Sequence, residues 1–320
     1  MQDILDTVQP VAEIAKHVHI NPEAIKTFAD SVKPDDLNGS EYNEENTLHD
    51  ATDEQRIAYA FVYDAVNFCY WGEPKWAVTT GGNELGGSAS MMQALKRAVE
   101  EGYDILNPEY LANISTSDLQ NVFRANVEIP LFSERLRLLH ELGQSVAKDF
   151  NGSFSEIVKR ANYNTADLVR LLVKSFSDVF DDHADYYGQR VNFYKRAQLV
   201  PAHIWDLGRL GLISHTISGF DELTAFADYK VPQLMRRFGI LQYSDDLAQK
   251  VDTQTLLEPG SDEEVEIRAT TIWANELATQ EVRKRIPSAN AAKVDGVLWF
   301  KGQDKSIADK PYHRTRTIWY

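Results

Sequence analysis

Asp228 lies where a carboxylate could do chemistry. It belongs to the run F-A-D-Y-K-V-P-Q-L-M-R-R-F-G-I, residues 226–240, between an apolar segment and the start of a predicted helix. Pro232 suits the first turn of that helix, and Gly239 can end it. The positive end of the helix dipole favours an ionised carboxylate at Asp228. Such a carboxylate can stabilise positive charge on a substrate, or it can simply cap the helix.

Basic residues are grouped at two other places. Lys195 and Arg196 lie within V-N-F-Y-K-R-A-Q-L, and the terminal P-Y-H-R-T-R-T-I-W-Y contains His313, Arg314 and Arg316. Arginine offers a planar fork of donors and lysine a point charge, which together suit a phosphate monoester. We expect this aromatic tail to pack against the body of the protein. The alternative is ordinary surface charges whose stems lie along a helix.

A third segment combines polar and aromatic residues. A T-x-x-Q capping box, Thr52 with Gln55, predicts a helix that begins near residue 53. This helix has a wide apolar surface, interrupted by Asp64 and Asn67. These two side chains could form satisfied hydrogen bonds in the interior. Tyr70, Trp71 and the glycine-rich run after them could form a wall for a flat ligand, or they could belong to the core.

The Asp228 run resembles the catalytic-aspartate segment of helix-hairpin-helix DNA glycosylases, D-x-x-V-x-x-x-x-x-R-[LF]-G-[LI]. A longer resemblance is to the queuosine salvage family, queuosine 5′-phosphate N-glycosylases (hydrolases) with a glycosylase-like helical fold. The stretches that carry it follow one order along nearly the whole chain: V-Y-D-A-V-N-F-C-Y-W (62–71), F-R-A-N-V-E-I-P-L-F-S-E-R (123–135), V-N-F-Y-K-R-A-Q-L (191–199), F-A-D-Y-K-V-P-Q (226–233), G-S-D-E-E-V-E-I-R-A (260–269) and P-Y-H-R-T-R-T-I-W-Y (311–320).

This resemblance implies roles for individual residues. Asp228 would be the catalytic residue. The residues expected to bind the base are His49, Asn67, Trp71, Phe226, Asp295 and Trp299. Those expected to bind the phosphate are Lys195, Arg196, His313 and Arg314. Family members often carry a second acid directly after the tryptophan, but Phe300 occupies that position here.

The implied activity is hydrolysis of queuosine 5′-phosphate to queuine and ribose 5-phosphate. Breaking an N-glycosidic bond builds positive charge on C1′, which an ionised Asp228 could stabilise while it activates water. Two alternatives remain open from the residues: a DNA or RNA base glycosylase, and a non-catalytic helical interaction module. The L-P-G-[VI]-G hairpin that grips DNA in DNA glycosylases is absent ahead of Asp228, which favours a mononucleotide substrate.

The composition of the chain limits the kinds of partner that the protein can bind. The formal net charge of −15 opposes binding to a nucleic acid polymer, although a local basic pocket can still hold a small anion. The single cysteine, Cys69, excludes an intrachain disulfide, and we expect neither a metal nor another cofactor. The N-terminus lacks the pattern of a signal peptide, and no apolar run is long enough for a membrane span. We therefore expect a cytoplasmic protein with no membrane association and no obligate protein partner.

The pattern of the chain predicts an all-α fold. Helical periodicity and start and stop signals recur along it, and Gly143 is predicted to end a helix that contains Leu136, Leu139 and Leu142. No hairpin turn is evident. We expect a multi-helix fold like that of DNA glycosylases, with at most minor β-structure in the C-terminal segment. A single domain would span 1–320, with N-terminal helices and an acidic loop (1–50) packed on its body.

Overall fold

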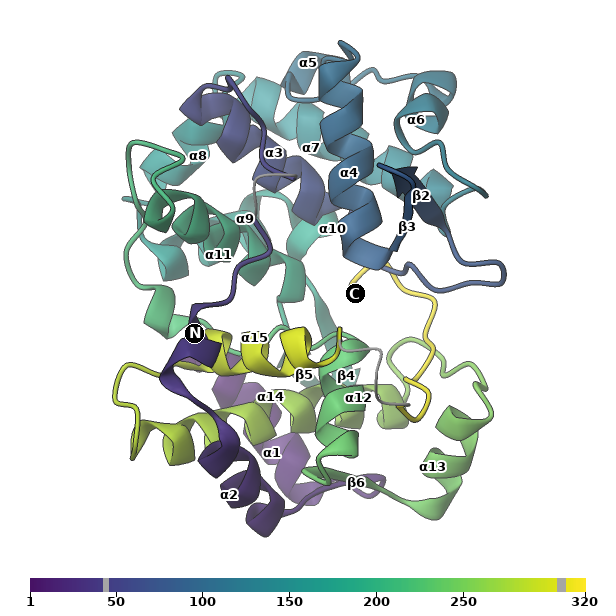
Figure 1. The fold of residues 1–320 in the computed structure, drawn as a ribbon, viewed down its shortest axis with the longest axis vertical. Helices are drawn as coiled ribbons and strands as arrows, with labels where there is room; N and C mark the ends of the chain where they lie inside the picture. The colour runs from purple at the N-terminus through teal and green to yellow at the C-terminus, as the bar shows by residue number, and fades with distance from the viewer. Residues whose placement is uncertain (43–45, 304–308) are drawn as a thin grey trace.

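A computed structural model describes residues 1–42, 46–303 and 309–320 of the chain. Helices dominate it, and their bounds follow the predicted signals closely in many places (Figure 1). The α-helices of the described residues are α1 (Gln2–Ile14), α2 (Pro22–Ser31), α3 (Asp53–Ala65), α4 (Gly87–Glu100), α5 (Pro108–Leu111), α6 (Thr116–Val122), α7 (Phe132–Asp149), α8 (Phe154–Arg160), α9 (Thr165–Ser175), α10 (Ser177–Phe180), α11 (Lys195–Arg209), α12 (Lys230–Arg237), α13 (Asp245–Asp252), α14 (Asp262–Arg283) and α15 (Ala291–Lys301). Two short 3₁₀ helices span Pro34–Asn38 and Phe220–Glu222.

The all-α prediction is wrong, because the described residues also form three two-stranded antiparallel sheets. They pair β1 with β6, β2 with β3, and β4 with β5. The strands span Val18–Ile20 (β1), Ala77–Thr80 (β2), Asn83–Gly86 (β3), His183–Tyr186 (β4), Gln189–Asn192 (β5) and Leu241–Tyr243 (β6). None of them lies in the C-terminal segment, for which the prediction allowed at most minor β-structure; in the described part of that segment, Arg314 forms an isolated bridge with Leu256. The fold is mixed, with helices predominant.

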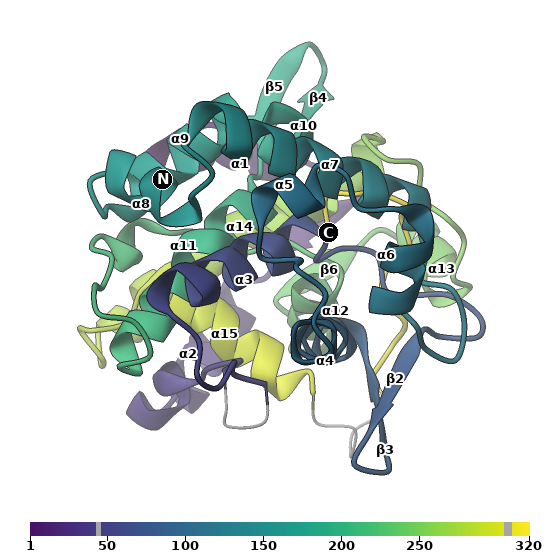
Figure 2. The ribbon, with the colours of Figure 1, turned by 90° about the horizontal axis from the view of Figure 1, so that it is seen from above.

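Two of these sheets are hairpins that the sequence analysis missed. The β2–β3 turn contains Gly81 and Gly82, and the β4–β5 turn contains Tyr187 and Gly188, all four with positive φ. A two-residue turn with both φ values positive matches the twist of paired strands. The strands are only four residues long and partly exposed, so they lack the alternating pattern that identifies longer strands. The two hairpins project from opposite sides of the molecule (Figure 2).

Buried apolar residues form two clusters. The larger draws mainly on the elements from α3 to α11, and the smaller on α2 and α12–α15. In Figure 1 the helices of the first group occupy the upper half of the molecule and the second group occupies the lower half, where β4 and β5 also lie. α15 contributes to the smaller cluster through Val294, Val297 and Leu298, and it lies along the boundary between the halves.

Several residues predicted to begin or end a helix do so in the structure, and one does not. Thr52 and Gln55 form the reciprocal capping box that starts α3, and Gly239 follows α12 with a φ of 71°. Gly143, however, lies inside α7, which continues to Asp149. A side chain at this position would collide with the backbone of α5, so the glycine permits close packing of two helices. None of the helices in the described ranges is long and apolar enough to cross a membrane.

Candidate functional site

A cavity of about 430 Å³ lies between elements of the two halves. One side comes from the segment after α3 and from α11; the other comes from the segment before α12 and from α15. The predicted site residues that line it are Asn67, Trp71, Lys195, Phe226, Asp228, Asp295 and Trp299. Phe300, the residue that replaces an expected acid, also lines it.

Asp228 lies at the start of α12 and faces this cavity. Its Oδ1 accepts hydrogen bonds from the backbone N–H groups of Lys230 (2.7 Å) and Val231 (2.8 Å). Asp228 is therefore a helix cap, yet its Oδ2 accepts no hydrogen bond within the described residues. Burial raises the pKa of Asp228, while Lys195 and the two backbone N–H groups act in the opposite direction. One oxygen is thus held in place and the other is available to a ligand.

A second carboxyl group, that of Asp295, belongs to the wall contributed by α15. Its Oδ1 accepts a hydrogen bond of 3.1 Å from the backbone N–H of Phe226, two residues before Asp228. Burial, together with repulsion from Asp228, holds the pKa of Asp295 well above its usual range. The short segment 226–231 therefore anchors both carboxyl groups of the cavity.

Lys195 begins α11, and its almost completely buried side chain lines the cavity. Its Nζ donates a hydrogen bond of 3.3 Å to the carbonyl oxygen of Asn67. Burial lowers the pKa of Lys195, and the nearby carboxylate of Asp228 opposes this change. Lys195 thus supplies positive charge close to Asp228.

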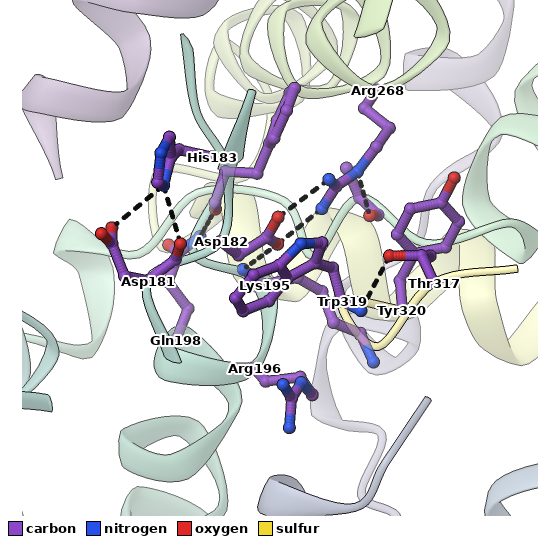
Figure 3. Close-up of polar contacts among 12 residues, drawn as sticks. Asp181, Asp182, His183, Lys195, Arg196, Gln198, Arg268, Thr317, Trp319 and Tyr320 are labelled. Atoms are coloured by element: carbon purple, nitrogen blue, oxygen red, sulfur yellow. Dashed lines mark hydrogen bonds and ion pairs between the residues drawn. The ribbon is translucent and has the colours of Figure 1, made fainter. Parts of the chain in front are cut away.

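A buried ion pair holds this part of the site together (Figure 3). Arg268 on α14 donates two hydrogen bonds to the carboxylate of Asp182, at 2.9 and 2.6 Å. Asp182 also accepts a bond from the backbone N–H of Lys195, and Arg268 donates one to the carbonyl oxygen of Ala227. The pair therefore connects α14 to the start of α11 and to the residue before Asp228.

Aromatic side chains form much of the remaining wall. Tyr70 stacks on Trp76, with ring centroids 6.2 Å apart, and Tyr229 contacts Tyr312. The buried Nε1 of Trp71 has no hydrogen-bond partner within the described residues. Flat apolar surfaces suit a heterocyclic base, and an unpaired N–H group in a cavity wall is available to a ligand.

Four predicted site residues do not line the cavity. His49 is exposed, and Arg314 lies beside Trp71 with its guanidinium 5.6 Å from the ring centroid. Arg196 is buried and donates to carbonyl oxygens at the end of α3, including that of Asp64. The buried His313 contacts the hydroxyl of Tyr320, and burial, followed by the charge of Arg268, lowers its pKa to about 3.

The structure also reveals cavity residues that the sequence analysis did not select, among them Glu41, His203, Tyr229 and Lys230. Glu41 comes from the acidic loop that was expected to pack on the body of the protein. The only signal for His203 was indirect: its partner is Asp64, the polar residue that interrupts the apolar surface of α3. Because this contact joins α11 to α3, the residue pattern of either helix alone does not predict it.

Two carboxyl groups and a lysine within aromatic walls define a site for a small molecule, with the means to stabilise positive charge on it. Residues 47–320 match the sequence profile of the family described as "Queuosine salvage protein", and the chain belongs to this family.

Its relatives include proteins named queuosine 5′-phosphate N-glycosylase/hydrolase from three distant organisms. The chain is similar to that of Sphaerobacter thermophilus, with 38% identity over 321 residues, covering 99% of this chain and 97% of the relative. It is 30% identical to that of Mus musculus over 328 residues, covering 97% and 96%. The similarity to that of Schizosaccharomyces pombe is 27% over 318 residues, covering 93% and 91%.

Proposed function

We propose that this protein hydrolyses the N-glycosidic bond of queuosine 5′-phosphate and releases queuine and ribose 5-phosphate. The observation that carries the proposal is the arrangement of Asp228, whose Oδ1 is held by two backbone N–H groups while its Oδ2 is left to the cavity. The names of the relatives supply the substrate.

In this proposal Asp228 acts in its ionised form. As the bond to the base lengthens, positive charge develops on C1′ and the ring oxygen of the ribose. A fixed carboxylate beside the sugar stabilises that charge, because it needs no reorganisation during the reaction. Oδ2 can also orient the attacking water and accept its proton.

Asp295 is the proposed contact for the guanine-like edge of the base. The hydrogen bond from Phe226 fixes its carboxyl group on the wall opposite the aromatic residues of the first half. An ionised carboxylate can accept two parallel N–H bonds from such an edge. Phe226, Trp71 and Trp299 would then enclose the ring by apolar contact.

Lys195 is the proposed contact for the phosphate. It is the one member of the four predicted phosphate-binding residues that lines the cavity in the described structure. Lys75 and Lys230 also contribute to the wall, which holds five acidic residues as well, so a phosphate would be bound at the part of the wall that the lysines form. Such a region favours a phosphate ester over a neutral nucleoside.

The test is to incubate the purified protein with queuosine 5′-phosphate and separate the products by chromatography. We expect free queuine and ribose 5-phosphate in equal amounts, identified by mass spectrometry, and far less of both products from Asp228→Asn in the same time. Absence of both products from the wild-type protein would contradict the proposal. That result would favour a non-catalytic module, whereas salt-sensitive binding to a nucleic acid duplex would favour a base glycosylase.

A further inference from the structure

His203 is a cavity residue that the proposed mechanism does not yet use. It lies on α11, two turns after Lys195, and its side chain is only 8% exposed. Its Nδ1 lies 2.8 Å from Oδ2 of Asp64, a carboxylate that is completely buried on α3. This bond fixes the plane of the imidazole ring and leaves the second nitrogen for another partner.

That second nitrogen has no hydrogen bond within the described part of the chain. Oε2 of Glu41, which also lines the cavity, lies 3.8 Å from Nε2, beyond hydrogen-bond distance. Glu41 is itself held by the hydroxyl of Tyr63, which donates to Oε2 at 3.1 Å. A nearly buried, oriented imidazole with a free nitrogen is an arrangement that awaits a ligand.

The charges around His203 favour its protonated form. Burial is the largest single influence and would lower its pKa, but the charge and hydrogen bond of Asp64, together with the charges of Glu41 and Asp206, more than offset burial and raise the pKa to about 9. The rings of Tyr42 and Tyr63 also border the imidazole, and burial raises the pKa of both phenols well above the usual range. At neutral pH the group is therefore an imidazolium among two carboxylates and two uncharged phenols.

We propose that His203 donates from Nε2 to the leaving base, with Asp64 as the residue that positions it. This inference rests on the proposed function. Queuine is a 7-deaza base, so it has no N7 to accept a proton, and departure must be assisted at another edge atom, the ring carbonyl oxygen or N3. A hydrogen bond that strengthens as negative charge develops on the base lowers the barrier.

The C1′–N bond breaks with its electron pair on the base, and the oxygen of water forms the new bond to C1′. The proton of water passes to Asp228, and the proton on Nε2 passes to the base, which leaves uncharged. Asp228 then loses its proton to solvent, and His203 takes one from solvent, so the site returns to its starting state.

The experiment compares two substrates that differ in their need for such help. Queuosine 5′-phosphate has a poor leaving group, whereas 4-nitrophenyl ribofuranoside 5-phosphate has one that departs as a stable anion. For His203→Gln we expect kcat to fall by ~10²–10⁴-fold on the nucleotide, the usual range for general acid catalysis, and by less than ~10-fold on the nitrophenyl substrate. Asp228→Asn should lose activity on both.

A matched control uses His140, which lies on α7 outside the cavity and contacts the carbonyl oxygen of Ile114 at 2.8 Å. His140→Gln should leave both rates unchanged. Equal losses on the two substrates for His203→Gln, or a small loss on the nucleotide, would overturn the inference. If the wild-type protein hydrolysed neither substrate, the proposed function itself would fail instead.

The pH dependence supplies a second test that does not need the nitrophenyl substrate. In the wild type, kcat on the nucleotide should decline as pH rises through the pKa of His203. Asp64→Asn removes the charge that favours the imidazolium, so this decline should move to lower pH. An unchanged alkaline limb in folded Asp64→Asn would overturn the assignment, because a merely structural role for Asp64 would not move it.

Discussion

At the scale of single residues, Asp228 combines two roles that the sequence presents as alternatives. Its Oδ1 caps α12, and its Oδ2 remains available to the cavity. A carboxylate has enough acceptor sites to serve both purposes. Capping then orients the group that the proposed chemistry needs, so the structural and functional interpretations do not compete.

Asp228→Asn should separate these roles. The amide can still accept backbone hydrogen bonds, but it carries no charge. We expect kcat on queuosine 5′-phosphate to fall by at least ~10²–10³-fold, and the free energy of unfolding to change by no more than ~1 kcal/mol. Because burial raises the pKa of Asp228, wild-type activity should fall on acidification at a pH above 3.8, the ordinary value. Near-normal turnover by the folded variant would leave Asp228 as a cap only.

Asp295 should link base binding to pH. Burial, and after it the charge of Asp228, raises the pKa of Asp295. Two N–H donors of the base would lower it again, so binding of queuine should release a proton, and affinity should rise with pH through this interval. Calorimetry in buffers of different ionisation enthalpy measures the proton release directly. Asp295→Asn should abolish the release and weaken binding by ~1.5–3 kcal/mol; equal enthalpies in all buffers for the wild type would argue against the contact.

Lys195 and Arg314 form a matched pair for testing phosphate recognition. Lys195 lines the cavity, whereas Arg314 lies beyond Trp71. One charge-assisted contact contributes ~1.5–3 kcal/mol, so Lys195→Ala should reduce the preference in kcat/KM for nucleotide over nucleoside by ~10–150-fold. Arg314→Ala should preserve this ratio. If the two variants behaved alike, or if the wild type showed no preference, Lys195 would not be the phosphate contact.

At the scale of elements, the position of the site residues depends on hydrogen bonds that link the start of α11 and the segment before α12 to α14. The Asp182–Arg268 pair binds the first turn of α11 and the carbonyl oxygen before Asp228 to the long helix α14 (Figure 3). A buried ion pair adds little net stability compared with an apolar replacement, but its loss leaves an uncompensated charge. Its value here is positional, because it sets Lys195 and Asp228 relative to each other.

Alanine substitutions at two glycines, Gly143 and Gly296, test how closely the helices pack. In α7, an added Cβ at Gly143 would lie 2.5 Å from the carbonyl oxygen of Pro108 and would also meet the backbone of Ala112. Gly143→Ala should therefore lower the free energy of unfolding by ~1–3 kcal/mol. In α15, a Cβ at Gly296 would meet nothing within 4 Å, so Gly296→Ala should raise it by ~0.5–1 kcal/mol. Urea denaturation measures both; a tolerated alanine at 143 would show that α5 can move away.

At the scale of the whole molecule, the C-terminal residue connects the two halves. The carbonyl oxygen of Tyr320 accepts a hydrogen bond of 2.9 Å from the N–H of Cys69, just after α3. Its hydroxyl donates to Glu264 on α14 at 2.8 Å. Since the cavity wall also draws on both halves, we propose that the chain folds as a single domain. The formal net charge of −15 disfavours binding of long polyanions.

Removal of the Tyr320 side chain should lower the free energy of unfolding. Tyr320→Ala deletes a buried aromatic side chain and leaves Glu264 without its donor, so we expect a loss of ~3–5 kcal/mol in the free energy of unfolding. Arg316→Ala, an exposed change in the same tail, should stay within ~0.5 kcal/mol of the wild type. Both are measured by denaturation followed with circular dichroism and fluorescence. Equal stability of the two variants, or two separate transitions in the wild type, would argue against a single domain joined by the tail.

The sequence by itself determined the features that depend on neighbouring residues. The cap at Thr52, the start of α12 and the glycine after it follow from local backbone chemistry, and all three agree with the structure. The family also followed from the sequence, because its motifs recur in one order along the chain. The position of Asp228 before a helix start also followed from local chemistry, whereas its catalytic role was implied by the resemblance to the family.

Only the tertiary structure decided which distant residues meet. The β1–β6 pairing joins residues more than 200 positions apart, and the two hairpins are too short to show an alternating pattern, so the all-α prediction failed. Arg196 and His313 have the right chemical types for phosphate binding, but their side chains are turned into the interior, where carbonyl oxygens and Tyr320 are their partners. His203 lines the cavity, and its ring is held there by Asp64 on another helix, a contact that neither helix shows by itself. Packing sets the direction and the neighbours of each side chain, and a single sequence does not contain that information locally.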